Sequence, residues 1–170
     1  MIGDVLTKAY QQILDMGNMP QEWNEGLIYM IPKTNGQLEE LRHWRPITSL
    51  NVIYKILAKT IARRLQPYLP ELIHDSQTGF MKERSIFDNI ILFWEMVAFA
   101  KLHKQDLAVL FLDFEKAYDR VDWDFMEGTL VRMGFPSKWI RGVSALYRNV
   151  HSSLLFAGDI GRNFSISRSV

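Results

Sequence analysis

Residues 107–119 read Leu-Ala-Val-Leu-Phe-Leu-Asp-Phe-Glu-Lys-Ala-Tyr-Asp, and the interpretation of the whole chain begins with this stretch. Its first six residues form a continuous apolar run of strand length, which predicts a buried central strand over 107–112. An aspartate at the end of such a strand is costly to bury, so Asp113 is either a turn or cap residue or part of a site. A carboxylate held there suits Mg²⁺, a hard cation that prefers oxygen ligands.

Upstream of this run, the pattern predicts a helix over 4–16 with one apolar face, stopped by Gly17 and Asn18. A short β-prone run follows at 26–31 and ends at Pro32. The polar segment 34–40 is then expected to be an exposed loop or hairpin tip.

The segment 51–66 carries two stripes that repeat every four residues and fall on roughly opposite faces of one helix. The apolar stripe is Ile53, Leu57, Ile61 and Leu65, and the cationic stripe is Lys55, Lys59 and Arg63. One interpretation is a surface helix with a solvated charged face. The other is a helix that lays its cations along a phosphate backbone.

Further helices are expected over 85–102, 122–133 and 136–147. The first begins at a Ser85 cap and is apolar nearly all round, which predicts that it is largely buried. Asp122 is a good N-cap for the second. The segments 152–156 and 163–167 alternate around a glycine-containing loop, as in a β-hairpin.

The composition of the chain limits the number of domains and the kinds of site that it can form. The chain has 170 residues, 48% of them hydrophobic, enough for a core and for one domain or somewhat more. Its 20 Lys and Arg balance 19 Asp and Glu, so a preference for nucleic acid must come from local clusters. No cysteine is present, which excludes disulfides and thiolate metal sites. With no signal peptide or bilayer-length apolar stretch, we expect an intracellular protein, nuclear or cytoplasmic, that is neither secreted nor membrane-bound.

Three blocks together resemble one family. They are Leu-Arg-His-Trp-Arg-Pro-Ile-Thr-Ser-Leu at 41–50, Gln-Thr-Gly-Phe-Met-Lys-Glu-Arg-Ser-Ile-Phe-Asp-Asn-Ile at 77–90, and the stretch around Asp113. In this order and at about this spacing, they closely resemble the reverse transcriptases of non-LTR (LINE-type) retrotransposons, over roughly residues 20–170.

The resemblance implies an α/β fold of the right-hand polymerase type. Residues 1–106 would be a mostly helical fingers region with an N-terminal helix. Residues 107–170 would be the first half of an antiparallel palm, without a thumb. The implied partners are an RNA template, a DNA primer and deoxynucleoside triphosphates.

The resemblance also implies roles for five residues. Asp113 and the backbone carbonyl of Phe114 would bind catalytic Mg²⁺, two ions being used in the complete enzymes. Tyr118 would lie under the sugar of the incoming nucleotide and favour deoxyribose. Lys33 and Arg45 would hold the triphosphate, which agrees with the need of phosphoryl transfer for cations on several sides.

Other interpretations remain open for these residues. Lys33 can be an ordinary loop lysine, Tyr118 can be core packing, and Arg45 can pair with Glu39 or Glu40. Three further side chains could meet the template, although a solvated loop explains them nearly as well; they are Gln77, Lys82 and Arg84. With Lys55, Lys59 and Arg63 they form the candidate nucleic-acid-binding set.

The family also uses an aromatic-Ala-Asp-Asp turn for its remaining carboxylates, and no Asp-Asp pair occurs in these 170 residues. We therefore expect the chain alone to be inactive and to hold Mg²⁺ weakly at an incomplete site, with apolar surface at 107–112 exposed. A viral-type RNA-dependent RNA polymerase is a close rival, against which Tyr118 argues. Two further hypotheses are a catalytically dead nucleic-acid-binding remnant and a relic open reading frame.

Overall fold

The computed structural model of the chain describes residues 2–33 and 39–168. Its contacts divide it into two compact units, Met1–Ile61 with Lys116–Val170, and Ala62–Glu115. These are called unit 1 and unit 2, and each is described by itself. None of the helices in the described part of the chain is long and apolar enough to cross a membrane.

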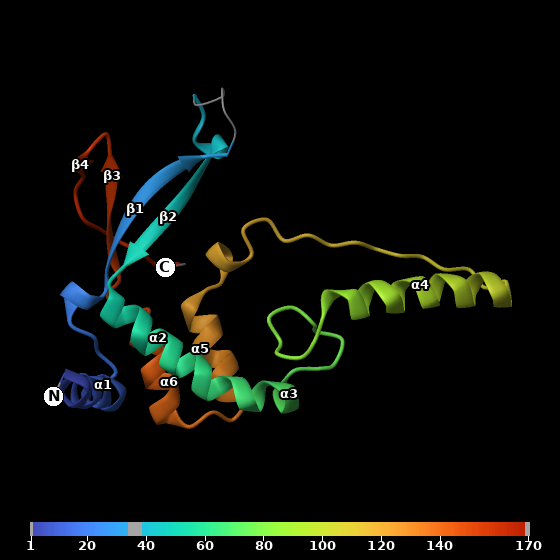
Figure 1. The fold of residues 1–170 in the computed structure, drawn as a ribbon, viewed down its shortest axis with the longest axis horizontal. Helices are drawn as coiled ribbons and strands as arrows, with labels where there is room; N and C mark the ends of the chain where they lie inside the picture. Colours follow the sequence, from blue (N-terminus) through green and yellow to red (C-terminus); the bar gives the residue numbers. More distant parts are fainter. Residues whose placement is uncertain (1, 34–38, 169–170) are drawn as a thin grey trace. The chain divides into compact units, whose positions relative to one another are not determined.

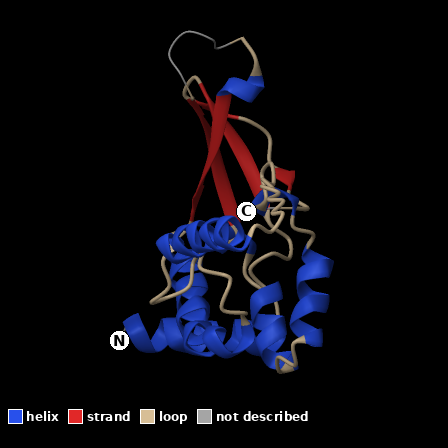
Figure 2. Cartoon of the chain, turned by 90° about the vertical axis from the view of Figure 1, so that its right-hand side faces the viewer, coloured by secondary structure: helices blue, strands red, loops and turns tan. Residues whose placement is uncertain are grey.

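Unit 1 combines helices with a small mixed sheet (Figures 1 and 2). Its helices are α1 (Ile2–Met16), α2 (Val52–Leu65, which continues into unit 2), α5 (Trp123–Arg132) and α6 (Ser137–Ser144). Its strands are β1 (Glu25–Pro32), β2 (Trp44–Leu50), β3 (His151–Phe156), β4 (Asp159–Ile160) and β5 (Phe164–Ser165). Short 3-10 helices lie at Gln21–Trp23, Leu41–His43 and Tyr118–Arg120. The mixed α/β class expected from the sequence is confirmed.

The sheet has the order β2-β1-β3-β4, with β5 also paired to β3. The strands β1 and β2 form an antiparallel hairpin, which confirms the strand expected at 26–31. Its tip, residues 34–38, lies outside the described residues. The pairing of β1 with β3 is parallel, with Gly26 opposite Ser152, and it was not expected from the sequence.

The core of unit 1 lies between α1, α2 and the turn after α6. Its buried side chains are Ile13, Tyr54, Leu57, Ile61, Ala145 and Leu146. The hydroxyl of Tyr54 donates to the carbonyl oxygen of Leu146 at 3.1 Å, so a polar group inside the core is satisfied. Burial raises the pKa of Tyr54. The apolar stripe predicted for 51–66 is confirmed, because Leu57 and Ile61 are buried in this cluster.

Unit 2 contains the 3-10 helix Gln66–Tyr68, the short α3 (Leu69–Leu72) and the long α4 (Ile86–His103). The predicted Ser85 cap is confirmed. The Ser85 hydroxyl accepts from the N–H of Phe87 at 3.2 Å, and the carboxylate of Asp88 accepts from the N–H of Ser85 at 3.0 Å. These reciprocal bonds form a capping box, which fixes where the helix begins.

The prediction of a buried strand over 107–112 is wrong for the described structure. These residues form no strand, and their side chains are exposed, Phe111 to 80%. The ring of Phe111 does meet that of Phe93 on α4, edge to face, with centroids 5.8 Å apart. An apolar run indicates that a segment tends to be buried, but a strand also needs a neighbour for its N–H and C=O groups. The described residues of unit 2 provide none.

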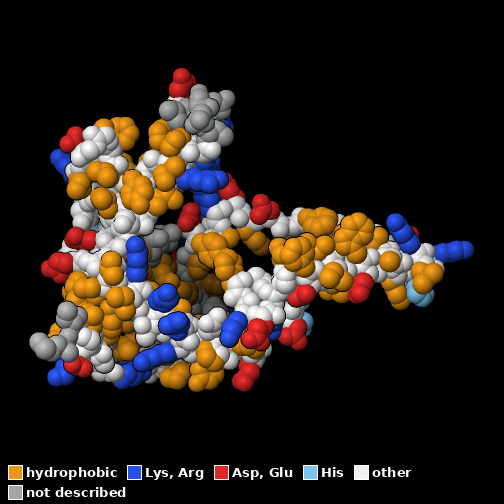
Figure 3. All heavy atoms as spheres, in the orientation of Figure 1, with side chains coloured by type: hydrophobic (Ala, Val, Ile, Leu, Met, Phe, Trp, Pro, Cys, Tyr) orange, Lys and Arg blue, Asp and Glu red, His pale blue; other side chains and the backbone are white. Residues whose placement is uncertain are grey.

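The prediction that helix 85–102 is largely buried is also wrong. Among the described side chains of α4, Ala100 is the only one that is buried. Hydrophobic side chains remain exposed along the helix, among them Phe87, Trp94 and Leu102 (Figure 3). The helix forms because its ends are capped locally, whereas its burial depends on neighbouring elements that local sequence does not specify.

Two other expectations differ in detail. The helix expected at 136–147 ends at Ser144 and continues as turns. The loop expected between the last two strands contains β4, which pairs with β3 through Leu155 opposite Ile160. The boundary at residue 106 between a fingers region and a palm is a different kind of division from the two units, and it stays a prediction.

Candidate functional site

Lys33 and Arg45 lie at the same end of the β1–β2 hairpin, the end away from α1 and α6 (Figure 1). Arg45 is paired with Ile31 on β1. Lys33 directly follows the last residue of β1, and its N–H donates to the carbonyl oxygen of His43 at 2.7 Å. Both side chains are exposed. The structure therefore brings together the two cations that were assigned to a triphosphate.

The contacts of these two side chains differ. The Nζ of Lys33 donates to the carbonyl oxygen of Arg42 at 2.7 Å, so it reaches across to the 3-10 helix that precedes β2. Glu40 forms its ion pair with Arg42. Among the described residues no carboxylate pairs with Arg45, so the alternative of an ion pair with Glu39 or Glu40 is not found. The two parallel N–H donors of the Arg45 guanidinium can therefore bind an external anion.

An apolar surface adjoins this pair, and it was not recognised from the sequence. Antiparallel partners share a sheet face, so Ile31 lies on the face of Arg45, and Tyr29 with its partner Ile47 lies on that face too. All three apolar side chains are partly exposed. The residues of β1 from Leu27 to Pro32 are all apolar, so the sequence does not show which of them share a face until the pairing partner is known.

Asp113 and Phe114 belong to unit 2 and are exposed. Since no strand precedes Asp113, the argument from the cost of burying a carboxylate does not apply to it. Within the described part of the chain, no three His, Cys, Asp or Glu side chains come close enough together to hold a metal ion. Among the described residues, Asp113 is therefore not joined by the converging ligands that a magnesium site needs.

Tyr118 begins the 3-10 helix Tyr118–Arg120 of unit 1, and its side chain is 70% exposed. Core packing, one of the interpretations left open, is therefore excluded for this ring. Asp122 is the N-cap of α5, because its carboxylate accepts from the N–H groups of Asp124 and Phe125 at 3.0 and 3.1 Å. The expectation that Asp122 is a cap residue is confirmed.

The cationic stripe of α2 is exposed at Lys55, Lys59 and Arg63. The spacing of four residues within one continuous helix places the three side chains along one face. The opposite face buries Leu57 and Ile61 in the core. The helix can therefore present its cations outward without disturbing the packing that holds it.

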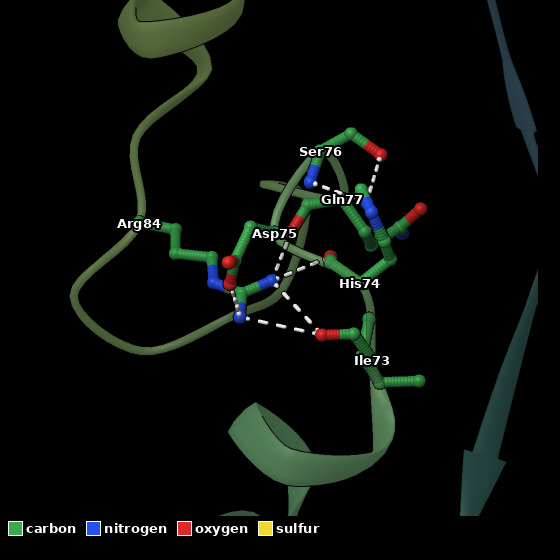
Figure 4. Close-up of polar contacts among 6 residues, drawn as sticks. All are labelled: Ile73, His74, Asp75, Ser76, Gln77 and Arg84. Atoms are coloured by element: carbon green, nitrogen blue, oxygen red, sulfur yellow. Dashed lines mark hydrogen bonds and ion pairs between the residues drawn. The ribbon is translucent and has the colours of Figure 1, made fainter.

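Gln77, Lys82 and Arg84 lie in the loop between α3 and α4, and their environments differ. Gln77 and Lys82 are exposed. The side chain of Arg84 is only 16% exposed and forms an ion pair with Asp75 at 2.9 Å (Figure 4). Arg84 also donates to backbone carbonyls of the same loop. These contacts give Arg84 a structural role, which sequence reasoning missed because the acceptors are carbonyl oxygens that any sequence supplies.

The comparisons with known proteins agree with the resemblance of the three blocks. Residues 31–159 match the family model of the reverse transcriptase (RNA-dependent DNA polymerase). The chain is 36% identical over 143 residues, 84% of its length, to the transposon TX1 uncharacterized 149 kDa protein of Xenopus laevis. It is 28% identical over 118 residues, 69% of its length, to the retrovirus-related Pol polyprotein from the type-1 retrotransposable element R2 of Popillia japonica.

The probable RNA-directed DNA polymerase from transposon BS of Drosophila melanogaster is 27% identical over 136 residues, 79% of this chain. The matched regions make up 11%, 16% and 15% of these three relatives, so the chain spans only a small part of their length. The family match nevertheless covers most of the chain. The chain belongs to the reverse transcriptase (RNA-dependent DNA polymerase) family and corresponds to part of the reverse transcriptase region of non-LTR retrotransposon proteins.

Proposed function

We propose that this chain is the nucleotide- and template-contacting part of a retrotransposon enzyme that copies RNA into DNA. The observation that carries the proposal is the position of Lys33 and Arg45 at one end of the same hairpin. The proposed substrates are deoxynucleoside triphosphates, an RNA template and a DNA primer. Arg45 would bind two phosphate oxygens through its planar fork, while Lys33 would add a point charge.

The chemistry of phosphoryl transfer explains why such a pair is useful. The reaction depends mostly on positioning the triphosphate and on stabilising negative charge on its oxygens. The exposed apolar side chains beside Arg45, Tyr29 among them, would offer a surface for the base or sugar. Tyr118 is proposed to lie against the sugar, where its ring would clash with a 2′-hydroxyl and so favour deoxyribose.

The place of Mg²⁺ in this proposal is limited. The carboxylate of Asp113 and the carbonyl of Phe114 are oxygen donors of the kind that Mg²⁺ takes. The described residues do not add the further carboxylates that would complete a site. We therefore propose Asp113 as one ligand among several in a complete enzyme, and we assign nucleotide and template binding, not the chemical step, to this chain.

The test is nucleotide binding by the 170-residue chain. A fluorescent deoxynucleoside triphosphate should bind wild type in a magnesium-free buffer. Loss of a hydrogen-bonded cation should weaken binding by about tenfold for Arg45→Ala, and by less for Lys33→Ala. Lys8→Ala removes an exposed cation of α1 and is the matched control, with no expected effect. Equal affinities for Arg45→Ala and wild type would remove the basis of the proposal.

The exposed stripe of α2 favours a second candidate, a nucleic-acid-binding remnant without catalysis. Each phosphate contact contributes about 0.7 to the slope of log affinity against log salt for single strands. Replacing Lys55, Lys59 and Arg63 together with alanine should therefore lower the slope for single-stranded RNA by about 2. This candidate is preferred if RNA binds with that salt dependence while the triphosphate does not bind.

A further inference from the structure

The loop between α3 and α4 is closed by one guanidinium group, that of Arg84 (Figure 4). One terminal nitrogen of Arg84 donates to the carbonyl oxygens of His74 at 2.8 Å and Gln77 at 2.9 Å. The other reaches the carboxylate of Asp75 at 2.9 Å, and both lie 3.3–3.4 Å from the carbonyl oxygen of Ile73. Arg84 thus joins the start of the loop to its end.

Two further sets of bonds hold the same loop. Thr78 is buried, and its hydroxyl accepts from the side-chain amide of Asn89 on α4 at 3.0 Å. The capping box of Ser85 and Asp88 fixes the residue that follows Arg84. The loop is therefore anchored to α4 on one side and to the residues after α3 on the other.

The backbone between these anchors is strained. Phe80 has φ of 61° and Glu83 has φ of 66°, in the left-handed region that residues with a Cβ rarely adopt. Such conformations persist only where the surrounding contacts determine them. The N–H of Met81 donates to the carbonyl oxygen of Thr78, and the N–H of Arg84 to that of Met81, both at 3.4 Å. The side-chain bonds of Arg84 add to these by joining the residues before Phe80 to the residue after Glu83.

The loop offers its solvent-facing side to a ligand while it keeps Arg84 inside. The side chain of Lys82 is 71% exposed, whereas that of Arg84 is 16% exposed. Both terminal nitrogens of Arg84 already donate within the loop. A phosphate would therefore meet the amide of Gln77 and the ammonium group of Lys82 first, and at Lys82 it would compete with the carboxylate of Glu83, 3.7 Å away. To reach Arg84 it would have to displace the loop's own bonds.

We infer that Arg84 is a positioning residue, which fixes the loop so that Gln77 and Lys82 face single-stranded nucleic acid in a preformed arrangement. The inference rests on the proposed contact between this loop and the template. In it Arg84 holds the loop in place and does not itself bind the template. A preformed loop loses less conformational freedom on binding, so Arg84 contributes to affinity without touching the ligand.

The experiment measures binding of a short, unstructured, fluorescein-labelled RNA by anisotropy, at several salt concentrations. It uses the full chain as wild type, Arg84→Gln, Arg84→Lys, Lys82→Ala and the Arg84→Gln/Lys82→Ala double variant. Arg162→Gln, an exposed arginine of unit 1, is the matched control. Hydrogen–deuterium exchange of the amides of residues 78–83 and of α4 follows the loop and the helix separately.

The expected result separates positioning from direct contact. Arg84→Gln should weaken binding by about threefold or more, with an unchanged salt slope. Lys82→Ala should lower the slope by about 0.7, the value for one phosphate contact on a single strand. Arg84→Lys should not restore affinity, because an ammonium group cannot reach these acceptors together. Lys82→Ala should cost less in the Arg84→Gln background, and loop amides should exchange faster while α4 amides do not.

Either of two results for Arg84→Gln would overturn the inference. A fall in salt slope for Arg84→Gln would show direct phosphate contact, and unchanged affinity would show no role in binding. If Arg84→Gln unfolds the chain, Asp75→Asn, which weakens the ion pair alone, should give a smaller loss with the same unchanged slope. Absence of salt-dependent RNA binding by wild type would instead refute the proposed template contact, and with it this inference.

Discussion

The parallel pairing of β1 with β3 can be tested at Gly26, which lies opposite Ser152. A Cβ added to Gly26 would lie 2.6 Å from Oγ of Ser152 and 2.9 Å from Cγ2 of Thr48. Both distances are shorter than side-chain contacts allow, and Ser152 is only 1% exposed, so it has no solvent to move into. Overpacking of this kind costs typically about 1–3 kcal/mol. We expect Gly26→Ala to lower the free energy of unfolding by that amount.

The assay is urea unfolding followed by tryptophan fluorescence, with Gly128→Ala as the matched control. A Cβ at Gly128, inside α5, meets nothing within 4 Å. That change should therefore stabilise by roughly 0.5–1 kcal/mol through helix propensity. Glycine-to-alanine substitution should therefore lower the free energy of unfolding at position 26 and raise it at position 128.

A second variant shows whether Ser152 is the cause. Among the described residues its buried Oγ has no hydrogen-bond partner, so Ser152→Ala alone should cost little. In the double variant the contact at 2.6 Å disappears and that with Thr48 remains. We expect part of the lost stability to return. A Gly26→Ala variant as stable as wild type would refute this explanation. So would a Gly26→Ala substitution that lowers the free energy of unfolding by the same amount with and without Ser152→Ala.

Three other predictions concern acid stability, catalysis and solubility. The hydrogen bond from Lys138, and after it that from Gln11, lowers the pKa of Asp15 in the folded chain. Ionised Asp15 therefore stabilises the fold above its unfolded pKa of about 4, and this stabilisation is lost as the pH falls through the lower folded pKa. Asp15→Asn should make the free energy of unfolding depend less steeply on pH in this acid range. The chain alone should incorporate no nucleotide in a primer-extension assay, because its 170 residues contain no Asp-Asp pair, and extension abolished by Asp113→Ala would contradict this. The exposed Leu110, Phe111 and Leu112 should promote self-association, so Phe111→Glu should lower the sedimentation-average mass of the chain, and a strictly monomeric wild type would argue against it.

Local signals in the sequence predicted where several helices begin or end. The capping residues Ser85 and Asp122 act through bonds to N–H groups two or three positions away, so their effect can be read from neighbouring residues. The apolar stripe of α2 can likewise be recognised locally, because its residues repeat every four positions. The stop after α1 follows from Gly17, whose φ of 73° is easy for glycine.

Features that depend on distant partners could not be predicted in this way. The pairing of Glu25 with His151 joins segments far apart in the sequence, and nothing local encodes it. The run at 107–112 has the composition of a buried strand, but composition does not supply a neighbouring strand. For the candidate site, the resemblance of the motifs suggested Lys33 and Arg45, and the pairing of β1 with β2 places them at one hairpin end. The role of Arg84 depends on carbonyl acceptors and stayed hidden until the loop was seen.

The most direct test of the proposed triphosphate pair is to compare the affinities of deoxythymidine tri-, di- and monophosphate for the chain and for its Lys33→Ala/Arg45→Ala variant. Wild type should bind the triphosphate most tightly and lose affinity as phosphates are removed, because each removes charge that the two cations contact. The variant should bind all three with the same weak affinity. A wild type that does not distinguish them, or a variant that keeps the preference for the triphosphate, would contradict the account.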